Sequence, residues 1–134
     1  MPPQITFDHN VIKVSDFAIS DAFYSKVLGV EISAPVEGFR TYKLGAQQLN
    51  VHGPGLKVGP EKLAKNPVAA GNSDIAFEWH GPIEEALAHL EACGVESHTG
   101  IVETHGCRGK GRSVYFRDPD GSLLEFITYP DSAD

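Results

Sequence analysis

An internal repeat is the feature of this sequence that most restricts how the chain can fold. Residues 8–31 (DHNVIKVSDFAISDAFYSKVLGVE) align without a gap on residues 73–96 (SDIAFEWHGPIEEALAHLEACGVE), and both segments end in Gly-Val-Glu. The offset is 65 residues (74 − 9), which is the separation of His9 and Asp74. Because self-similarity at one offset indicates a repeated supersecondary unit, the sequence predicts two similar modules.

Each copy has the sequence pattern of one strand, one helix and three further strands. The opening strands are predicted in apolar-rich segments at 10–14 and 75–79, and the helices at 20–28 and 82–93. The fold class is therefore α+β, with two tandem βαβββ modules. The remaining strands are predicted over 30–35, 39–45, 46–52, 95–102, 112–119 and 121–129.

The first predicted helix carries signals for its start, its buried side and its end. Asp16 stands where a turn or a capping side chain precedes the helix. The helical period places Ala22, Phe23 and Val27 on one side, which we expect to be buried. Gly29 follows as a residue suited to a left-handed C-cap.

The chain length predicts one compact domain over residues 1–134. Within it we expect module 1 at about 4–53, a connecting loop at about 54–72 and module 2 at about 73–129. The connecting segment is rich in Gly, Pro and Lys and is long for a connector, so it is expected to be a crossover or a mobile flap.

Composition excludes several classes of partner. The chain has 11 basic and 18 acidic residues and a net charge of −7, which argues against nucleic acid or an anionic membrane as the main partner. No apolar run has the length of a membrane span, and the first residues lack the pattern of a signal peptide. Two cysteines in unrelated contexts do not indicate a disulfide framework. These features predict a soluble cytoplasmic protein.

Polar side chains stand at equivalent places on the predicted strands. The repeat pairs His9 with Asp74, and strand alternation puts both on the face turned away from the helices. In the last strand of each module Asn50 is the counterpart of Glu125, and His52 lies on the same face as Asn50. The apolar residues at alternate positions are expected on the helix side: Ile12, Val14, Leu49, Val51, Phe77, Trp79, Leu124 and Phe126.

Four of these polar groups form a candidate metal site, namely His9, His52, Asp74 and Glu125. Imidazole nitrogen with carboxylate oxygen suits Zn, Ni, Mn or Fe(II) better than it suits a soft metal. An alternative stays open, because a single strand histidine is also typical of a hydrogen-bonded structural or surface residue, and Glu125 alone fits a strand that faces water. Burying that carboxylate without a cation or donors would be unfavourable.

Two segments, DHNVIKVSDFAISDAFYSKVLGVEI and SVYFRDPDGSLLEF, together with the paired modules, resemble the vicinal oxygen chelate superfamily. That superfamily contains glyoxalase I, bleomycin-resistance proteins, fosfomycin-resistance thiol transferases and extradiol dioxygenases. The resemblance covers about residues 4–129 and is strongest to small single-domain glyoxalase-like proteins. It implies a U-shaped, partly closed mixed sheet with the helices on its outer face, a ligand and a divalent metal ion inside, and a homodimer.

The resemblance also assigns roles to residues. It places metal ligands at His9, Asp74 and Glu125. Asp74 stands where metal-binding members usually have histidine, and Asn50 stands where glyoxalase I has a ligating glutamate, so His52 would supply the missing imidazole. Glu125 is also the predicted catalytic residue. The substrate-binding residues are predicted to be Asn50, Tyr115 and Arg112.

The leading functional prediction is a metal-dependent lyase or isomerase of the glyoxalase type. It would act on a small molecule with vicinal oxygens, through an enediolate-type intermediate that the metal stabilises as a Lewis acid. One alternative is a metal-free protein that binds a small molecule or antibiotic, as bleomycin-resistance proteins do. A further alternative is an extradiol-type dioxygenase.

Overall fold

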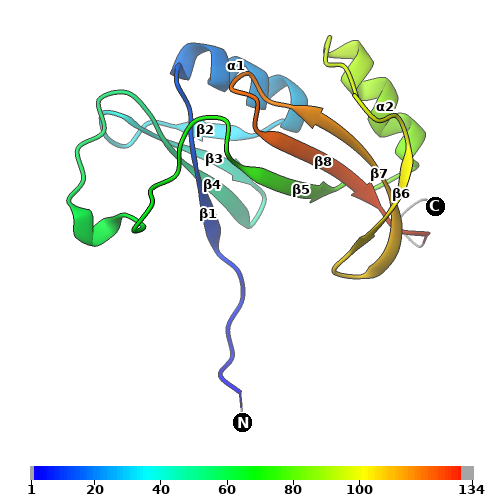
Figure 1. The fold of residues 1–134 in the computed structure, drawn as a ribbon, viewed down its shortest axis with the longest axis horizontal. Helices are drawn as coiled ribbons and strands as arrows, with labels where there is room; N and C mark the ends of the chain where they lie inside the picture. The colour runs from blue at the N-terminus through cyan, green and yellow to red at the C-terminus, as the bar shows by residue number, and fades with distance from the viewer. Residues whose placement is uncertain (1, 131–134) are drawn as a thin grey trace. The chain divides into compact units, whose positions relative to one another are not determined.

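The computed structural model describes residues 2–130. The chain divides into two compact units, Met1–Ala69 (unit 1) and Ala70–Asp134 (unit 2). Unit 1 contains β1 (His9–Lys13), α1 (Phe17–Leu28), β2 (Glu31–Ser33), β3 (Phe39–Leu44), β4 (Gln47–His52) and the short 3-10 helix η1 (Pro60–Lys62). Unit 2 contains β5 (Asp74–Glu78), α2 (Ile83–Ala92), β6 (Val102–Gly106), β7 (Gly109–Arg117) and β8 (Leu123–Thr128), as Figure 1 shows.

The two units have the same sheet topology. The strand order is β1-β4-β3-β2 in unit 1 and β5-β8-β7-β6 in unit 2. The first and last strands of each unit pair in parallel, and the other pairs are antiparallel, so both four-stranded sheets are mixed. β1 and β5 start at His9 and Asp74, which is the offset of the repeat. The predicted α+β class and the two βαβββ modules are confirmed.

Both helices have the local signals that the sequence predicts. Asp16 caps α1, because its carboxylate accepts a hydrogen bond from the Ile19 amide at 3.0 Å. Gly29 ends α1 with a φ of 68°, a left-handed conformation that glycine adopts without strain. The α-helices have 12 and 10 residues, and neither of these described helices is long and apolar enough to cross a membrane.

The buried side of α1 differs from the prediction. Ala22 is exposed and Phe23 half-buried, whereas Ser20, Tyr24 and Val27 are buried. Ser20 lies in the interior because its hydroxyl is 2.7 Å from the Tyr42 hydroxyl of β3. The sequence prediction used apolar residues alone to find the buried side of the helix, so it missed a serine whose hydroxyl has a buried partner. The predicted buried side is therefore rotated about the helix axis by part of a turn.

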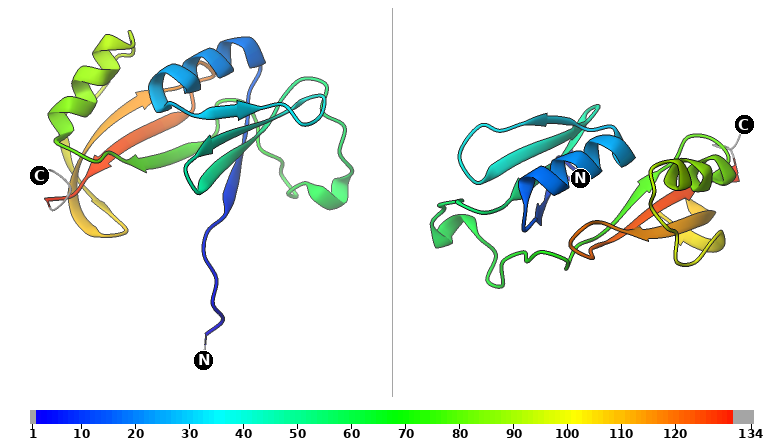
Figure 2. Two further views of the ribbon diagram at one scale, coloured as in Figure 1. Left: turned by 180° about the vertical axis from the view of Figure 1, so that it is seen from behind. Right: turned by 90° about the horizontal axis from the view of Figure 1, so that it is seen from above.

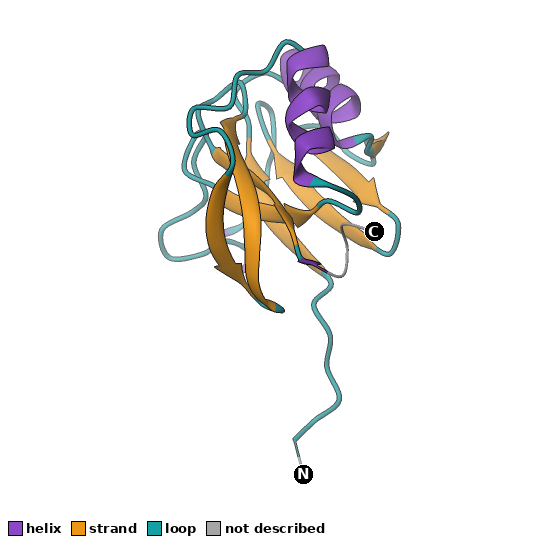
Figure 3. Cartoon of the chain, turned by 90° about the vertical axis from the view of Figure 1, so that its right-hand side faces the viewer, coloured by secondary structure: helices purple, strands orange, loops and turns teal. Residues whose placement is uncertain are grey.

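The helix side of each sheet carries the apolar core, as strand alternation predicts. In unit 2, α2 lies along one face of β7 and β8 (Figures 2 and 3). Phe77 and Trp79 are half-buried, and the Trp79 ring contacts Phe126 with centroids 5.2 Å apart. The other six residues assigned to this side are buried: Ile12, Val14, Leu49, Val51, Leu124 and Phe126.

One predicted strand is misplaced. The segment 95–102 does not form a strand before Val102, and the glycine-rich segment after it forms the β6–β7 hairpin. A Cβ at Gly106 would lie 2.0 Å from the Tyr129 hydroxyl, so only glycine lets the hairpin approach that ring. Arg108 at the hairpin tip pairs with Glu78 at 2.9 Å. A glycine such as Gly106, which the hairpin needs to approach the Tyr129 ring, resembles a loop residue in the sequence.

Candidate functional site

Glu125 occupies the middle of the unit 2 sheet, on the face opposite α2. In the strand register it is paired with Ala76 of β5 and with Tyr115 of β7. Its neighbours Leu124 and Phe126 are buried on the helix side. Side chains alternate along a strand, so Glu125 points away from the core and is half-buried.

The hydroxyl groups of Ser113 and Tyr115 bind the Glu125 carboxylate. The Ser113 hydroxyl donates to Glu125 Oε2 at 2.5 Å, and Thr104 Oγ1 lies 2.6 Å from Ser113 Oγ. The Tyr115 hydroxyl is also hydrogen-bonded to Glu125. Hydrogen bonds to an ionised group are shorter and stronger than those between neutral groups, so this carboxylate is held in place.

Tyr115 connects the Glu125 carboxylate with that of Asp74. Burial is the largest cause that raises the pKa of Tyr115 above its ordinary value, and the negative charge of Glu125, the hydrogen bond to it and the charge of Asp74 add to the shift. Asp74 is two residues before Ala76 on β5, and therefore on the same face as Glu125. Unit 2 thus brings two predicted ligands and one predicted substrate-binding residue to one face.

The equivalent face of unit 1 has amides where unit 2 has a carboxylate. Asn50 is paired with Val11 and Thr41, as Glu125 is with Ala76 and Tyr115. Asn50 Oδ1 accepts a hydrogen bond from Gln48 Nε2 at 2.7 Å. Asn50 is therefore the structural counterpart of Glu125. Its hydrogen-bond partner on the same strand, Gln48, is neutral.

The two predicted histidine ligands of unit 1 are not neighbours. His9 is opposite Gln48 in the register, whereas His52 is opposite Lys13. Four residues along a strand correspond to roughly 13 Å, so the two histidines lie far apart along this face of the sheet. His9 Nδ1 lies 2.7 Å from the Asp8 carboxylate. Partial burial, followed by the positive charge of Lys13, lowers the pKa of His52 below its ordinary value.

The described residues contain no cluster of potential metal ligands. Among residues 2–130, no group of three or more His, Cys, Asp or Glu side chains gathers as a potential metal site. Asp74 begins β5 and Glu125 lies in β8, whereas His9 begins β1. These hard oxygen and nitrogen donors match the chemistry of Zn, Mn or Fe(II) ligands. The set of His9, His52, Asp74 and Glu125 stays a prediction.

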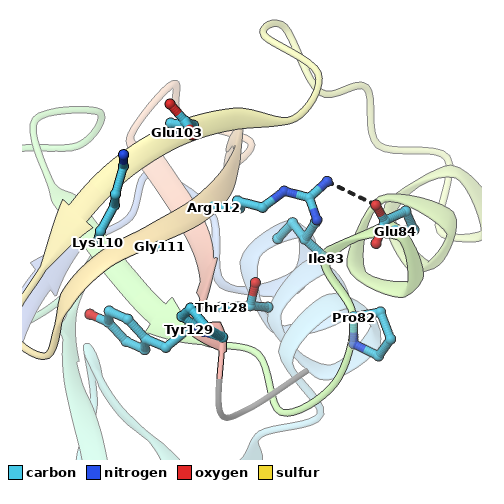
Figure 4. A pocket seen from close by; sticks show the side chains of 10 residues that line it. Pro82, Ile83, Glu84, Glu103, Lys110, Gly111, Arg112, Thr128 and Tyr129 are labelled. Atoms are coloured by element: carbon cyan, nitrogen blue, oxygen red, sulfur yellow. Dashed lines mark hydrogen bonds and ion pairs between the residues drawn. The ribbon is translucent and has the colours of Figure 1, made fainter. Parts of the chain in front are cut away.

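Arg112 lies away from Glu125, beside a separate cavity. Arg112 is opposite Thr128 in the register, which places its side chain on the α2 side of β7. There its guanidinium donates to the Glu84 carboxylate at 2.8 Å. These residues, with Lys110 and Ile83, line a cavity of about 400 Å³ at the start of α2 (Figure 4). The sequence prediction grouped Arg112 with Tyr115, but the structure puts them on opposite faces.

Two residues of the site were not predicted from the sequence, namely Ser113 and Thr104. Ser113 alternates with Tyr115 along β7, so the hairpin with β8 already implies that it shares the face of Glu125. Thr104 gave no such signal, because β6 was expected before residue 103. Its position follows only from the β6–β7 register, in which Val102 is opposite Ser113.

Comparisons with known proteins agree with this architecture. The family model of the glyoxalase/bleomycin resistance protein/dioxygenase superfamily matches residues 6–126. The virulence protein STM3117 of Salmonella typhimurium is 32% identical over 122 residues, which cover 91% of this chain and 83% of that protein. The solved structure of the V. cholerae integron cassette protein VCH_CASS1 is 35% identical, with a TM-score of 0.85, and the match covers 96% of this chain and 98% of that one.

A more distant structure shares the fold alone. The fosfomycin resistance protein FosX of Listeria monocytogenes is 20% identical with a TM-score of 0.63, and the match covers 95% of this chain and 93% of that one. FosX was solved in complex with Mn(II) and dihydroxypropylphosphonic acid. At this level of identity the match supports the modules and their strand order and carries no assignment of individual residues.

Proposed function

Because the chain belongs to the glyoxalase/bleomycin resistance protein/dioxygenase superfamily, we propose that it is an enzyme of the glyoxalase type. Membership confirms the resemblance to the vicinal oxygen chelate superfamily that the sequence predicts. The reaction that we propose is lyase or isomerase chemistry on a small molecule with two vicinal oxygens. The observation that carries this proposal is the half-buried Glu125 carboxylate, which Ser113 and Tyr115 hold on the face of the sheet opposite α2.

Glu125 is proposed to act as the base. A carboxylate beside a bound α-hydroxy carbonyl compound takes the proton from the carbon next to the carbonyl, and the electron pair of that C–H bond forms the double bond of an enediolate. Return of the proton to the former carbonyl carbon, with transfer of the hydroxyl proton to the former carbonyl oxygen, completes an isomerisation and restores the carboxylate. Tyr115, which shares a hydrogen bond with Glu125, is proposed to orient a substrate oxygen.

The donor set fits a divalent cation. We propose that Asp74 and Glu125 are the ligands from unit 2, with His9 as the predicted ligand from unit 1. When bound, Zn, Ni, Mn or Fe(II) would act as a Lewis acid toward the two vicinal oxygens. His52 is left out of this set because of its separation from His9 along the sheet. The Mn(II) in the FosX complex supports a metal of this type.

A metal-free binding protein is the second candidate function. The observation that favours it is Asn50, a neutral amide at the position equivalent to Glu125, already engaged by Gln48. A small molecule would then bind to polar and aromatic side chains such as Tyr115 without a reaction. An extradiol-type dioxygenase remains the third alternative from the sequence. The two candidate functions differ in whether the purified protein retains metal.

We further propose that the protein is a cytoplasmic homodimer. Superfamily members commonly form dimers, and this chain has apolar side chains for a partner to cover. Ile5 and Phe7, in the segment before β1, are 82% and 72% exposed. Two such residues at alternate positions of an extended segment form one apolar edge. A second copy of the chain is the proposed partner.

Metal content of the purified protein tests the proposed function. We expect the wild type to retain a divalent metal, and Glu125→Ala and His9→Ala to retain less than a tenth as much, because each removes a ligand. Glu103→Ala is the matched control, since Glu103 is exposed and opposite Arg112, on the α2 side of the sheet. Equal metal content in the wild type and Glu125→Ala would contradict a metal-dependent enzyme and favour the binding protein.

A further inference from the structure

Three hydroxyl and carboxyl side chains form a line across three strands of unit 2. Thr104 lies on β6, Ser113 on β7 and Glu125 on β8. Thr104 Oγ1 is 2.6 Å from Ser113 Oγ, and Ser113 Oγ is 2.5 Å from Glu125 Oε2. The line leads from the edge strand β6 to the residue proposed as the base.

The direction of these hydrogen bonds is fixed by chemistry. An ionised carboxylate only accepts hydrogen bonds, so the single Ser113 hydroxyl proton points to Glu125 Oε2. Ser113 Oγ then accepts from the Thr104 hydroxyl, because that is the remaining proton between them. Linked hydrogen bonds of this kind polarise and strengthen each other. Thr104 therefore supports the bond that Ser113 makes.

Burial makes the middle link rigid. Ser113 has no exposed surface, so water does not replace its contact with Glu125. Gly111, opposite Thr104, has no side chain to fill the space beside Ser113, and a Cβ there would lie 2.5 Å from the Thr128 carbonyl oxygen. The backbone of β7 is thus constrained at Gly111, two residues before Ser113. Ser113 therefore has a fixed position from which to bind Glu125.

We propose that Ser113, supported by Thr104, is a positioning residue that fixes the orientation of the Glu125 carboxylate. Ser113 binds Oε2 from within the sheet, and this bond sets the orientation in which the carboxylate, together with Tyr115, meets the ligand. This inference deepens the proposed function and rests on it for the role of Glu125, but the orientation itself is a property of the metal-free protein.

Unit 1 supplies a matched control. Ser33 Oγ and Thr41 Oγ1 form a similar hydroxyl pair at 2.5 Å between β2 and β3. Thr41 is opposite Asn50, whose Oδ1 is bound by Gln48. The Ser33–Thr41 hydroxyl pair therefore lies next to an amide, where the Thr104–Ser113 pair lies next to the Glu125 carboxylate. Ser33→Ala removes a hydroxyl–hydroxyl bond of the same kind without touching Glu125.

The first measurement is NMR relaxation of the Glu125 side chain in the metal-free protein. We expect a rigid side chain in the wild type and in Ser33→Ala, and a clearly lower order parameter in Ser113→Ala. Thr104→Val, which keeps the shape and removes the hydroxyl, should lower it less, and Thr104→Ser should restore it. If Ser113→Ala does not fold, the comparison of Thr104→Val with Thr104→Ser still tests the proposal. Unchanged Glu125 order in Ser113→Ala, or in Thr104→Val where only that variant folds, overturns the proposal.

The second measurement is titration with Mn²⁺ alone. If Glu125 is a ligand, Ser113→Ala should weaken Mn²⁺ binding about tenfold or more, as loss of a residue that orients a ligand commonly does, and Ser33→Ala should not. If Glu125→Ala abolishes Mn²⁺ binding, then binding within about twofold of the wild type in Ser113→Ala would overturn the positioning role. A mobile Glu125 in Ser113→Ala, in a protein that binds no Mn²⁺ in any form, would support the orientation and contradict the proposed metal site.

Discussion

The two units place their polar networks on opposite faces of sheets that have the same strand order. In unit 1 the network lies on the helix side, where the Tyr42 hydroxyl donates to Asp21 Oδ1 at 2.7 Å and accepts from Ser20 at 2.7 Å. The residue equivalent to Tyr42 in unit 2 is Phe116, since they are opposite Leu49 and Leu124 respectively. Unit 2 has its network on the other face, at Glu125.

This difference separates a structural network from a candidate site. Tyr42 is fully buried, and its bonds join β3 to α1, so they hold a helix on a sheet. Burial is the largest of the causes that raise the pKa of Tyr42. Glu125 joins only strands to one another and faces away from the helix. The duplicated fold thus provides the same core twice, and unit 2 adds a hydroxyl-bound carboxylate on the face turned away from its helix.

Truncation of equivalent core residues should have the largest effect on stability. Leu49→Ala and Leu124→Ala remove buried side chains from equivalent positions, and each should lower the free energy of unfolding by about 2–5 kcal/mol. Urea denaturation measures this, with Val36→Ala at an exposed position as the control. A change below ~1 kcal/mol at either leucine would contradict the claim that both units have the same core.

Exchange of the hydroxyl on the helix side should have the next largest effect. Tyr42→Phe removes one buried and one partly buried hydrogen bond and should lower the free energy of unfolding by about 1–3 kcal/mol. Phe116→Tyr should also destabilise, because Phe116 is fully buried against Phe126 and a new hydroxyl there would need a partner. If both variants unfold in urea like the wild type, the network of unit 1 has no structural role.

The segment before β1 distinguishes unit 1 in another way. Replacement of Ile5 and Phe7 by serine should raise the dissociation constant of the proposed homodimer about tenfold or more, since it removes exposed apolar surface that a second copy would bury. Sedimentation velocity over a concentration series measures the constant. Ile19→Ser is the control, because Ile19 is 57% exposed on α1. Equal dissociation constants for the double variant and the wild type would exclude this segment from the interface.

The smallest expected effect is on the titration of His52. Partial burial and the charge of Lys13 lower its pKa below 6.5, so the folded protein binds this proton less readily than the unfolded chain. The contribution to stability is therefore present above pH 6.5 and is lost as the pH falls through the lowered pKa. NMR titration should find the His52 midpoint below 6.5, and Lys13→Ala should raise it. A midpoint at or above 6.5 would contradict this description.

Much of the fold was predictable because the repeat and strand alternation are local signals. His9 and Asp74 open equivalent strands, and Leu124 and Phe126 face the core as alternation requires. The position of β6 was not predictable, since the glycines around Arg108 serve close packing against Tyr129 and look like a loop in the sequence.

The candidate site was only partly predictable, because it depends on register. Alternation assigns His9 and His52 to one face, but the pairing of β1 with β4 decides that they are four residues apart along it. Arg112 was grouped with Tyr115 without use of alternation, although an odd separation along one strand places them on opposite faces. Glu125 was identified because the repeat makes it the counterpart of Asn50 and the family resemblance assigns a metal ligand there, and neither argument needs the strand register.

Turnover by Glu125→Gln tests the central claim most directly. The substrate is the hemithioacetal of methylglyoxal and glutathione, with Mn²⁺ present and Glu103→Ala as the control, since Glu103 is exposed on the α2 side of the sheet. We expect the wild type to turn over, Glu125→Gln to be slower by a factor of about 10²–10⁴ because the base is lost, and Glu103→Ala to stay close to the wild type. Turnover by Glu125→Gln at the wild-type rate would contradict the assignment of Glu125 as the base.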